Sequence, residues 1–494
     1  MGKYMNNIKK IFLIVLLLIV LASCTEEIPT EDESNDETTV IPTNPGNIEE
    51  TPEVKVDKVN FVMINDTHGA FVDSSDGYSI AKVDTLLDKL ELNNGEYIKI
   101  ANGDILQGSY VSTKTYGYQM IESLNVMDFD AFVIGNHEFD WGLDKIAKYK
   151  DGDLSNGEAD YPFLGANIFY RGTTKSPEWI DPYTIINYSG INVGIIGLIG
   201  GYQESDILAT NISEYEFLDD STNLVKKYSL ELRNEKDCDV VVVAIHDYDE
   251  GINKKIASLP SESKIDAIFC AHTHQLITDY VIRSDGINIP VVQNYDKNET
   301  VQTVVLALDG RHQMQAYQTF DYRTKSFDDS SDLDELFAKY KGYIDESETV
   351  IGYTNSYLSR EVLGKIAAQA MYKYNYNVYG FENIDLTILN TGGVRTAIKN
   401  GDITVGDVFN TFPFENEIHL VKLFGSEVKL LANSSYYYSY STINFEDDKI
   451  YIVAVIDYVY FGPYTESIFD KKTAEHDTNI LMRDIFLEYI KNNY

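Results

Sequence analysis

The chain has 494 residues, 44% of them hydrophobic, which is enough to fill at least two hydrophobic cores. Acidic side chains outnumber basic ones by 78 to 40, and the formal net charge is −38. This balance argues against duplex nucleic acid as a partner, because a phosphate backbone is bound by cationic surfaces. It does not exclude a small anionic substrate, since bound metal ions set the local field at a metal site.

Residues 1–24 have the pattern of a targeting segment that is not part of the folded protein. Basic residues precede the apolar run Ile11–Leu21, which is too short for a comfortable membrane span. The sequence Leu21-Ala22-Ser23-Cys24 resembles the bacterial lipobox, and this resemblance implies cleavage before Cys24 and lipid attachment to its sulfur. A plain signal peptide and an uncleaved anchor are the alternatives. Residues 25–56 are acidic and poor in large apolar side chains, so we expect a disordered tether that lifts the folded domains off the membrane.

From Val59 onward, short apolar runs of strand type alternate with segments of helical period. The expected strands are Val59–Ile64, Tyr97–Ala101, Phe129–Ile134, Tyr161–Asn167, Ile191–Leu198, Val240–Ile245, Ile265–Cys270, Pro290–Asn294 and Val301–Leu308. The expected helices are Ser79–Leu92, Tyr116–Asn125, Ser221–Asn234 and Asn253–Leu259. Such β-α-β alternation predicts an α/β domain with a parallel sheet covered by helices. Cys238 and Cys270 adjoin two of the strands, and we interpret them as buried free thiols, with a disulfide as the open alternative.

Five of the expected strands are followed directly by residues that commonly bind metals. In chain order these residues are Asp66 and His68, Asp104, Asn136 and His137, His246, and His272 and His274. The chain has only eight histidines, and five of them fall in these motifs. Ligands of an open α/β sheet bind at the carboxyl ends of its strands, so we expect these side chains to converge on one place.

The stretch from Gly135 to Gly142 reads Gly-Asn-His-Glu-Phe-Asp-Trp-Gly and follows a buried strand. Its glycines allow a sharp turn and a close approach of the backbone to a ligand. Taken alone, the stretch is equally compatible with a turn that holds a hydrogen-bonded Asn and a structural His. Together with the four other motifs it indicates a metal site.

The region Tyr322–Glu346 is charged and weakly periodic, and we place a partly helical interdomain linker at residues 322–348. The N-terminal domain is then 57–321, and a smaller C-terminal domain is 349–494. In the second domain we expect helices at Leu363–Tyr372 and Ile480–Lys491 and strands at Leu386–Asn390 and Tyr451–Tyr458. The fold class is therefore α/β, or α+β when both domains are taken together.

Two divalent metals about 3.5–4 Å apart can hold a phosphate ester between them and bind the attacking hydroxide. A carboxylate must bridge them, and Asp104 is the obvious candidate. The motifs Asp66-x-His68, Gly103-Asp104, Gly135–Glu138, His246 and His272-x-His274 resemble those of the calcineurin-like metallophosphoesterases. The chain is also similar to the bacterial and animal 5′-nucleotidase family over roughly residues 57–494. The stretches that carry this similarity are Asn65–Gly69, Asn136–Gly142 and Phe163–Asn167.

The resemblance implies an N-terminal β-sandwich flanked by helices and a C-terminal α/β substrate-binding domain. It also implies a ligand set, with Asp66, His68, Asp104 and His274 on one metal ion and Asp104, Asn136, His246 and His272 on the other. Asn136 is expected to contact the substrate as well. His137 would act on the phosphoryl group and the leaving oxygen and would be oriented by Asp140, because a carboxylate raises the pKa of an imidazole and fixes its tautomer. The mixed nitrogen and oxygen ligands suit zinc, manganese or iron.

The second domain carries three expected substrate contacts. Arg395 follows a glycine turn that matches the family, Phe414 lies in its most recognisable stretch, Gly401–Asn416, and Tyr458 falls where a second stacking aromatic is expected. Ordinary packing is the alternative for each of the three residues. The family's Gly-Gly-Asp-Gly-Tyr turn is replaced here by Phe-Gly-Pro-Tyr, residues 461–464, without its carboxylate. In addition, Ala271 occupies the position before His272-x-His274 at which the family usually has Gly. Residues 359–364 lack the Asn that the family has before its hydrophobic-Gly pair.

The sequence therefore predicts a lipid-anchored, extracytoplasmic enzyme that hydrolyses nucleoside 5′-phosphates with two divalent metals. One alternative is a phosphatase or 2′,3′-cyclic-nucleotide phosphodiesterase with another substrate. A second is a surface lipoprotein that binds nucleotides without turnover. The metal identity, the base preference and the oligomeric state stay open.

Overall fold

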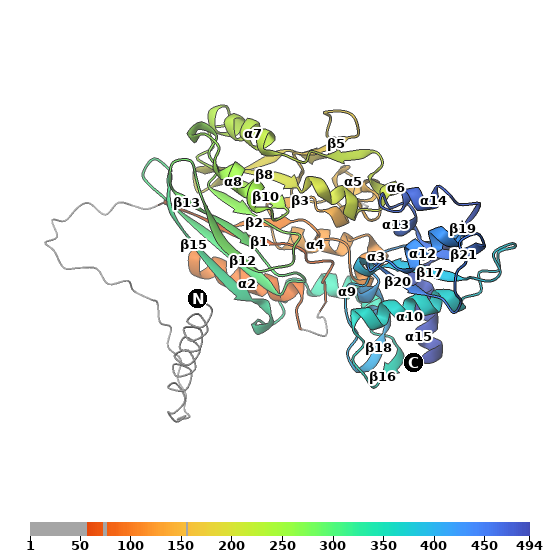
Figure 1. The fold of residues 1–494 in the computed structure, drawn as a ribbon. Helices are drawn as coiled ribbons and strands as arrows, with labels where there is room; N and C mark the ends of the chain where they lie inside the picture. Colours follow the sequence, from red (N-terminus) through yellow and green to blue (C-terminus); the bar gives the residue numbers. More distant parts are fainter. Residues whose placement is uncertain (1–56, 73–76, 155–156) are drawn as a thin grey trace, which may run out of the picture. The chain divides into compact units, whose positions relative to one another are not determined.

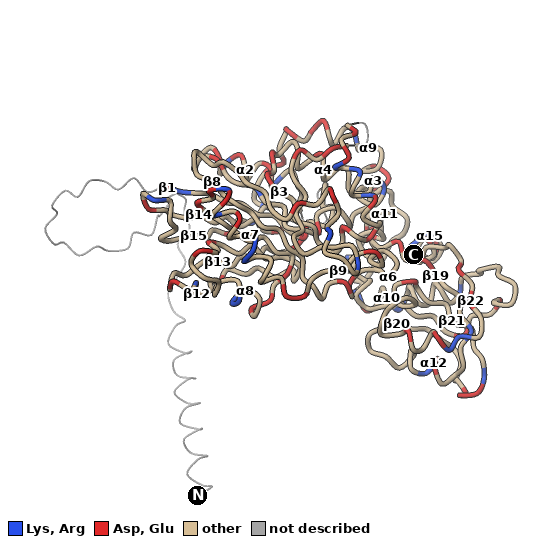
Figure 2. The backbone as a smooth tube through the Cα atoms, turned by 90° about the horizontal axis from the view of Figure 1, so that it is seen from above, with Lys and Arg blue, Asp and Glu red and all other residues tan. Residues whose placement is uncertain are grey.

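The computed structural model of the chain describes residues 57–72, 77–154 and 157–494. The expected targeting segment, the lipid-attachment residue Cys24 and the tether 25–56 lie outside the described residues. Within the described part, no helix is long and apolar enough to cross a membrane. Acidic residues occur along the whole described backbone, with Lys and Arg scattered among them (Figure 2).

A seven-stranded sheet contains the first three of the strands expected to precede the metal-binding motifs (Figure 1). In spatial order its strands are β15 (Met314–Arg323), β14 (Thr300–Leu308), β1 (Asp57–Ile64), β2 (Ile98–Asn102), β3 (Ala131–Val133), β4 (Phe163–Leu164) and β6 (Ile180–Asp181). The strands from β1 to β6 run parallel, whereas β14 and β15 join at the edge as antiparallel neighbours. The carboxyl ends of β1, β2 and β3 therefore meet at one edge of the sheet.

A six-stranded sheet carries the other two strands. Its order is β12 (Ile277–Ile282), β13 (Asn288–Gln293), β11 (Ala267–Phe269), β10 (Val240–His246), β8 (Ile191–Ile199) and β7 (Tyr183–Tyr188). The four central strands are parallel, and the two edge strands are antiparallel. A separate two-stranded ribbon consists of β5 (Ile168–Tyr170) and β9 (Tyr215–Phe217).

The two sheets form a sandwich because their strands are apolar on both faces. In β1, Val59, Phe61 and Met63 pack in one core with residues of β8, β10 and β11. The alternate residues Val62 and Ile64 pack in a second core with helices. A strand turns successive side chains to opposite faces, so β1 belongs to both cores.

Helices cover the outer faces of the sandwich. Those that pack in the core beside the first sheet include α2 (Ile80–Asn94), α3 (Tyr110–Thr115), α4 (Tyr118–Val126), α5 (Leu143–Ala147), α6 (Ala209–Ile212) and α9 (Asp334–Ser347). Those beside the second sheet are α7 (Thr222–Asn234) and α8 (Glu250–Ala257). Helix α2 begins where the sequence predicts, because the Ser79 side chain accepts a hydrogen bond from the amide of Lys82.

The C-terminal domain has its own hydrophobic core around a five-stranded sheet. The strand order is β20 (Tyr437–Tyr440), β17 (Leu386–Asn390), β21 (Ile450–Ile456), β19 (Glu417–Phe424) and β22 (Ala474–Leu481), and β16 (Val350–Thr354) pairs separately with β18 (Gly401–Thr404). The helices are α10 (Arg360–Lys373), α11 (Val405–Thr411), α12 (Gly425–Ala432), α13 (Asp457–Tyr460), α14 (Glu466–Phe469) and α15 (Met482–Asn493).

Several expected elements have other bounds in the structure. The strand predicted to end at Tyr458 ends at Ile456, and Tyr458 lies on helix α13, whose first turn is stabilised by a hydrogen bond from the Tyr458 amide to the Asp457 carboxylate. The strand expected at Tyr161–Asn167 is reduced to the two residues of β4. Helix α9 lies in the expected linker, yet Tyr340 on it is packed in the core of the first domain.

Candidate active site

The predicted metal-binding residues gather at the carboxyl ends of β1, β2, β3, β10 and β11; His246 is the last residue of β10, and the others lie just beyond their strands. Five of them have a backbone in the left-handed region, with φ of 49° at Asp66, 48° at His68, 54° at Asp104, 74° at His272 and 55° at His274. This conformation costs a non-glycine residue on the order of 1–3 kcal/mol, and it persists where the surrounding structure enforces it. Strain concentrated in these turns indicates a functional site.

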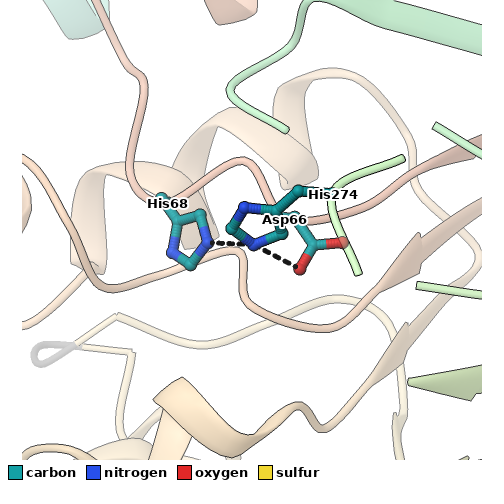
Figure 3. A group of neighbouring side chains, drawn as sticks. All are labelled: Asp66, His68 and His274. Carbon is teal, nitrogen blue, oxygen red and sulfur yellow. Dashed lines mark hydrogen bonds and ion pairs between the residues drawn. The ribbon is translucent and has the colours of Figure 1, made fainter. Parts of the chain in front are cut away.

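One group of ligand atoms comprises Asp66, His68 and His274 (Figure 3). Nε2 of His274 lies 3.3 Å from Oδ1 of Asp66 and 3.1 Å from Nε2 of His68. The two imidazoles thus turn the same nitrogen toward each other and toward the carboxylate. Asp66 is fully buried, and His68 is 7% exposed.

A second group comprises Asp104, His246 and His272. Nε2 of His246 lies 3.2 Å from Oδ2 of Asp104 and 4.0 Å from Oδ1 of Asp66. Nδ1 of His272 lies 3.0 Å from Oδ1 of Asn136. The structure therefore brings together all seven residues predicted as ligands. A third group, His68, Asp104 and His137, joins the first two and places His137 among the residues that could bind a metal.

The residues present fit divalent cations. Among the described residues, three buried atoms that face one another lack a hydrogen-bond partner: Oδ1 of Asp66, Oδ2 of Asp104 and Nε2 of His246. Burial alone would raise the pKa of Asp104, but His246 and His137 hold that pKa well below its ordinary value. Buried anionic oxygens next to imidazole nitrogens form a donor set that zinc, manganese and iron accept.

Glu138 holds the Asp104 turn in place. Its carboxylate accepts hydrogen bonds from the amides of Gly135 (2.8 Å), Asp104 (2.9 Å), Ile105 (3.0 Å) and Leu106 (3.2 Å). Burial and the neighbouring Asp104 raise the pKa of Glu138 to about 7. The sequence alone assigns Glu138 no role, and its only signal there is its position inside the motif that contains His137.

Two glycines are required by the close packing of this site. A Cβ atom on Gly103 would lie 2.3 Å from Nδ1 of His246, and one on Gly135 would lie 2.4 Å from Oδ1 of Asp104. Gly103 also has a φ of +80°, which disfavours any side chain there.

Main-chain carbonyl groups fix the tautomers of two imidazoles. Nδ1 of His246 donates to the carbonyl oxygen of Asn102 at 2.9 Å, and Nδ1 of His68 donates to that of Gln107 at 3.3 Å. In the neutral imidazole the opposite nitrogen, Nε2, carries no proton, and in both residues Nε2 faces the cluster. Such outer partners orient metal ligands and raise their basicity.

His137 stands at the edge of the cluster. Its Nδ1 donates to Oδ2 of Asp140 at 2.8 Å, and its Nε2 lies 3.9 Å from Oδ2 of Asp104. Its main-chain amide donates to Oδ1 of Asp104. Burial would lower the pKa of His137, but Asp104 and Asp140 raise it above its ordinary value. An imidazole held in this way can donate a proton from Nε2.

The three predicted substrate contacts of the C-terminal domain line the same cavity, which has a volume of about 1570 Å³. The Phe414 ring lies 5.5 Å from the His137 ring, with an interplanar angle of 27°. The guanidinium carbon of Arg395 lies 5.8 Å from the centre of the Phe414 ring. Tyr458 also lines the cavity, and its hydroxyl donates to the main-chain oxygen of Ser205 at 3.0 Å.

A carboxylate lies next to Tyr458, although not in the turn at residues 461–464 where the family has one. Asp457 is buried, and its Oδ1 accepts a hydrogen bond from Nδ2 of Asn416 at 2.9 Å. Burial raises the pKa of Asp457 to about 6. Asp457 thus connects the loop that carries Phe414 to the helix that carries Tyr458.

Two family models match the chain. "Calcineurin-like phosphoesterase" matches residues 59–276, and "5'-nucleotidase, C-terminal domain" matches residues 341–460. The chain is a member of the 5′-nucleotidase family. It combines an N-terminal metallophosphoesterase domain with a C-terminal 5′-nucleotidase domain, as expected, and it is a metal-dependent phosphoesterase.

Several relatives support this assignment. The chain is 24% identical to the cell wall protein Lmo0130 of Listeria monocytogenes, over 88% of this chain and 67% of that protein. It is 24% identical to a 5'-nucleotidase of Vibrio cholerae, over 76% of this chain and 75% of that protein. It is 27% identical to the endonuclease YhcR of Bacillus subtilis over 67% of this chain, but it spans only 28% of that longer protein.

A solved structure has the same fold. The 5'-nucleotidase precursor of Thermus thermophilus superposes with a TM-score of 0.73 at 19% sequence identity, and the match covers 88% of this chain and 96% of the other. The likeness therefore extends through both domains.

Proposed function

We propose that the chain hydrolyses nucleoside 5′-phosphates to nucleoside and phosphate with two divalent metal ions. The observation that carries this proposal is the position of Phe414 and Arg395, which the C-terminal domain brings beside His137 at the metal-binding cluster. An aromatic ring and a cation next to a phosphoesterase centre match an ester whose leaving group carries a nucleobase. The Vibrio cholerae relative, named a 5'-nucleotidase, supports the same substrate class.

The seven clustered residues would hold the two metals, with Asp104 between them. Bound divalent metals would supply Lewis acidity toward the phosphate and a hydroxide as the nucleophile. His137 would donate its Nε2 proton to the leaving oxygen, and Asp140 would keep the other nitrogen protonated and stabilise the imidazolium. Arg395 would offset the negative charge of the substrate, and Phe414 and Tyr458 would hold its base.

A phosphatase or 2′,3′-cyclic-nucleotide phosphodiesterase with another substrate is the second candidate. It is favoured by the turn at residues 461–464, which lacks the carboxylate that the family uses to fix the nucleoside. Binding without turnover is disfavoured by the His137–Asp140 pair, because a protein that only binds nucleotides has no use for a proton donor at its metal site.

We propose an extracytoplasmic location on the outer face of the cell membrane. The lipobox-like sequence ending at Cys24 and the acidic segment 25–56 support a lipid anchor and a tether. The relative from Listeria monocytogenes is named a cell wall protein, which agrees with an extracytoplasmic protein. We further propose that residues 57–321 and 349–494 are the two domains and that 322–348 connects them.

The test is an assay of residues 57–494 on a panel of phosphate esters with Mn²⁺ or Zn²⁺. We expect release of phosphate from a nucleoside 5′-phosphate that exceeds release from p-nitrophenyl phosphate, and loss of both activities on chelation. Absence of turnover on the whole panel, with the metals shown by mass spectrometry to be bound, would contradict an enzymatic role.

A further inference from the structure

Gln107 contacts both walls of the cavity, namely the metal-binding cluster on one side and the loop that carries Phe414 on the other. It lies three residues beyond Asp104, and 1% of its surface is exposed. Its main-chain carbonyl accepts the hydrogen bond from Nδ1 of His68 described above. Its side chain reaches the opposite wall, where Nε2 donates to the carbonyl oxygen of Pro413 at 3.0 Å.

Arg483 holds the same carbonyl group from the other side. It lies near the start of α15, is 2% exposed, and donates from Nη1 to Pro413 at 2.9 Å and to Phe412 at 3.3 Å. Arg483 belongs to the same domain as this loop, so it fixes the loop to its own domain. The Gln107 bond instead ties the loop to the domain that carries the metal-binding cluster.

We propose that Gln107 is a positioning residue that sets the place of the Phe414 ring relative to the metal-binding cluster, and so favours esters with a nucleobase. This inference rests on the proposed nucleotidase function and deepens it. Pro413 and Phe414 share a peptide bond, so any shift of the Pro413 carbonyl also moves the Phe414 backbone. A small ester without a base does not depend on the position of that ring.

The variant Gln107→Leu removes the donor and keeps a side chain of similar size. The Pro413 carbonyl retains its bond to Arg483, so no buried acceptor loses all its partners. One buried hydrogen bond is worth about 0.5–1.5 kcal/mol, or on the order of 2- to 12-fold. We expect kcat/KM for a nucleoside 5′-phosphate to fall by that factor, with a smaller loss for p-nitrophenyl phosphate and an unchanged metal content.

Gln119→Leu is the matched control. Gln119 lies on α4, is fully buried, and is not among the residues that line the cavity. The substitution removes the hydrogen bond that the Gln119 side-chain oxygen accepts from the Thr115 hydroxyl, and it should not change the ratio of the two kcat/KM values. A Gln107→Leu protein that changes this ratio therefore shows a positional effect and not general instability.

Hydrogen exchange supplies a measurement that needs no substrate. Gln107→Leu should increase amide exchange at Phe414–Asn416, and Gln119→Leu should leave it unchanged. If the unsubstituted protein has no preference for nucleotides, the proposed substrate is wrong, and the exchange data alone decide whether Gln107 positions the loop. If the unsubstituted protein prefers nucleotides but Gln107→Leu alters neither the ratio nor the exchange, the inference is overturned while the proposed function stands.

Discussion

The two walls of the cavity are held in different ways. On the metal-binding wall, Asp66, Asp104 and His246 are at most 1% exposed, and buried hydrogen bonds and strained turns fix their backbone. On the opposite wall, Phe414 and Arg395 are only partly buried. The chemistry therefore depends on a buried cluster, whereas substrate choice depends on side chains that are partly exposed. The two properties should be separable by substitution.

The largest effect is expected for Asp104→Ala. Asp104 lies next to both groups of ligands, so its loss should remove metal from the site and lower activity by more than roughly 100-fold. Metal content measured by mass spectrometry on the folded variant is the check. An Asp104→Ala protein that keeps two metal equivalents would show that this carboxylate is not shared.

His137→Ala should reduce kcat by roughly 10²- to 10⁴-fold, because it removes a positioned proton donor. Unlike Asp104→Ala, it should leave the metal content intact. His312→Ala is the control, since His312 is paired with Asp57 and Asp239 and is not among the cavity-lining residues. Loss of a metal equivalent from the His137 variant would make His137 a ligand and would refute the role given to it.

Glu138→Gln tests whether the Glu138 carboxylate holds the Asp104 turn in the shape that metal binding needs. The new amide group places donors against main-chain N–H groups that now donate to a carboxylate. We expect metal affinity to fall roughly 10- to 100-fold, as for other outer partners of metal ligands. Titration of the metal-free protein with Zn²⁺ measures this. Unchanged affinity would mean that the Asp104 turn holds its shape without Glu138.

The metal-binding wall could be predicted from the sequence because its signals are local. An apolar run followed by Asp, Asn or His predicts a strand, and it also predicts that the polar side chain lies at the carboxyl end of that strand. Glu138 and Gln107 could not be assigned roles, since their partners are main-chain groups brought close only by folding. Tyr458 was placed at the end of a strand because Tyr451–Ile456 is apolar. At the start of the helix that begins at Asp457, the Asp457 carboxylate instead accepts hydrogen bonds from the Tyr458 amide and from the distant side chain of Asn416.

Phe414→Ala tests the central claim that the C-terminal side of the cavity recognises a base. Loss of one base–aromatic stack costs roughly 1–3 kcal/mol, which is on the order of 5- to 150-fold in kcat/KM. The measurement compares a nucleoside 5′-phosphate with p-nitrophenyl phosphate, together with a melting curve of the variant. We predict a fall of that size for the nucleotide and a much smaller loss for the small ester. Equal losses for both substrates in a stably folded variant would leave the metal centre intact and contradict nucleotide recognition by Phe414.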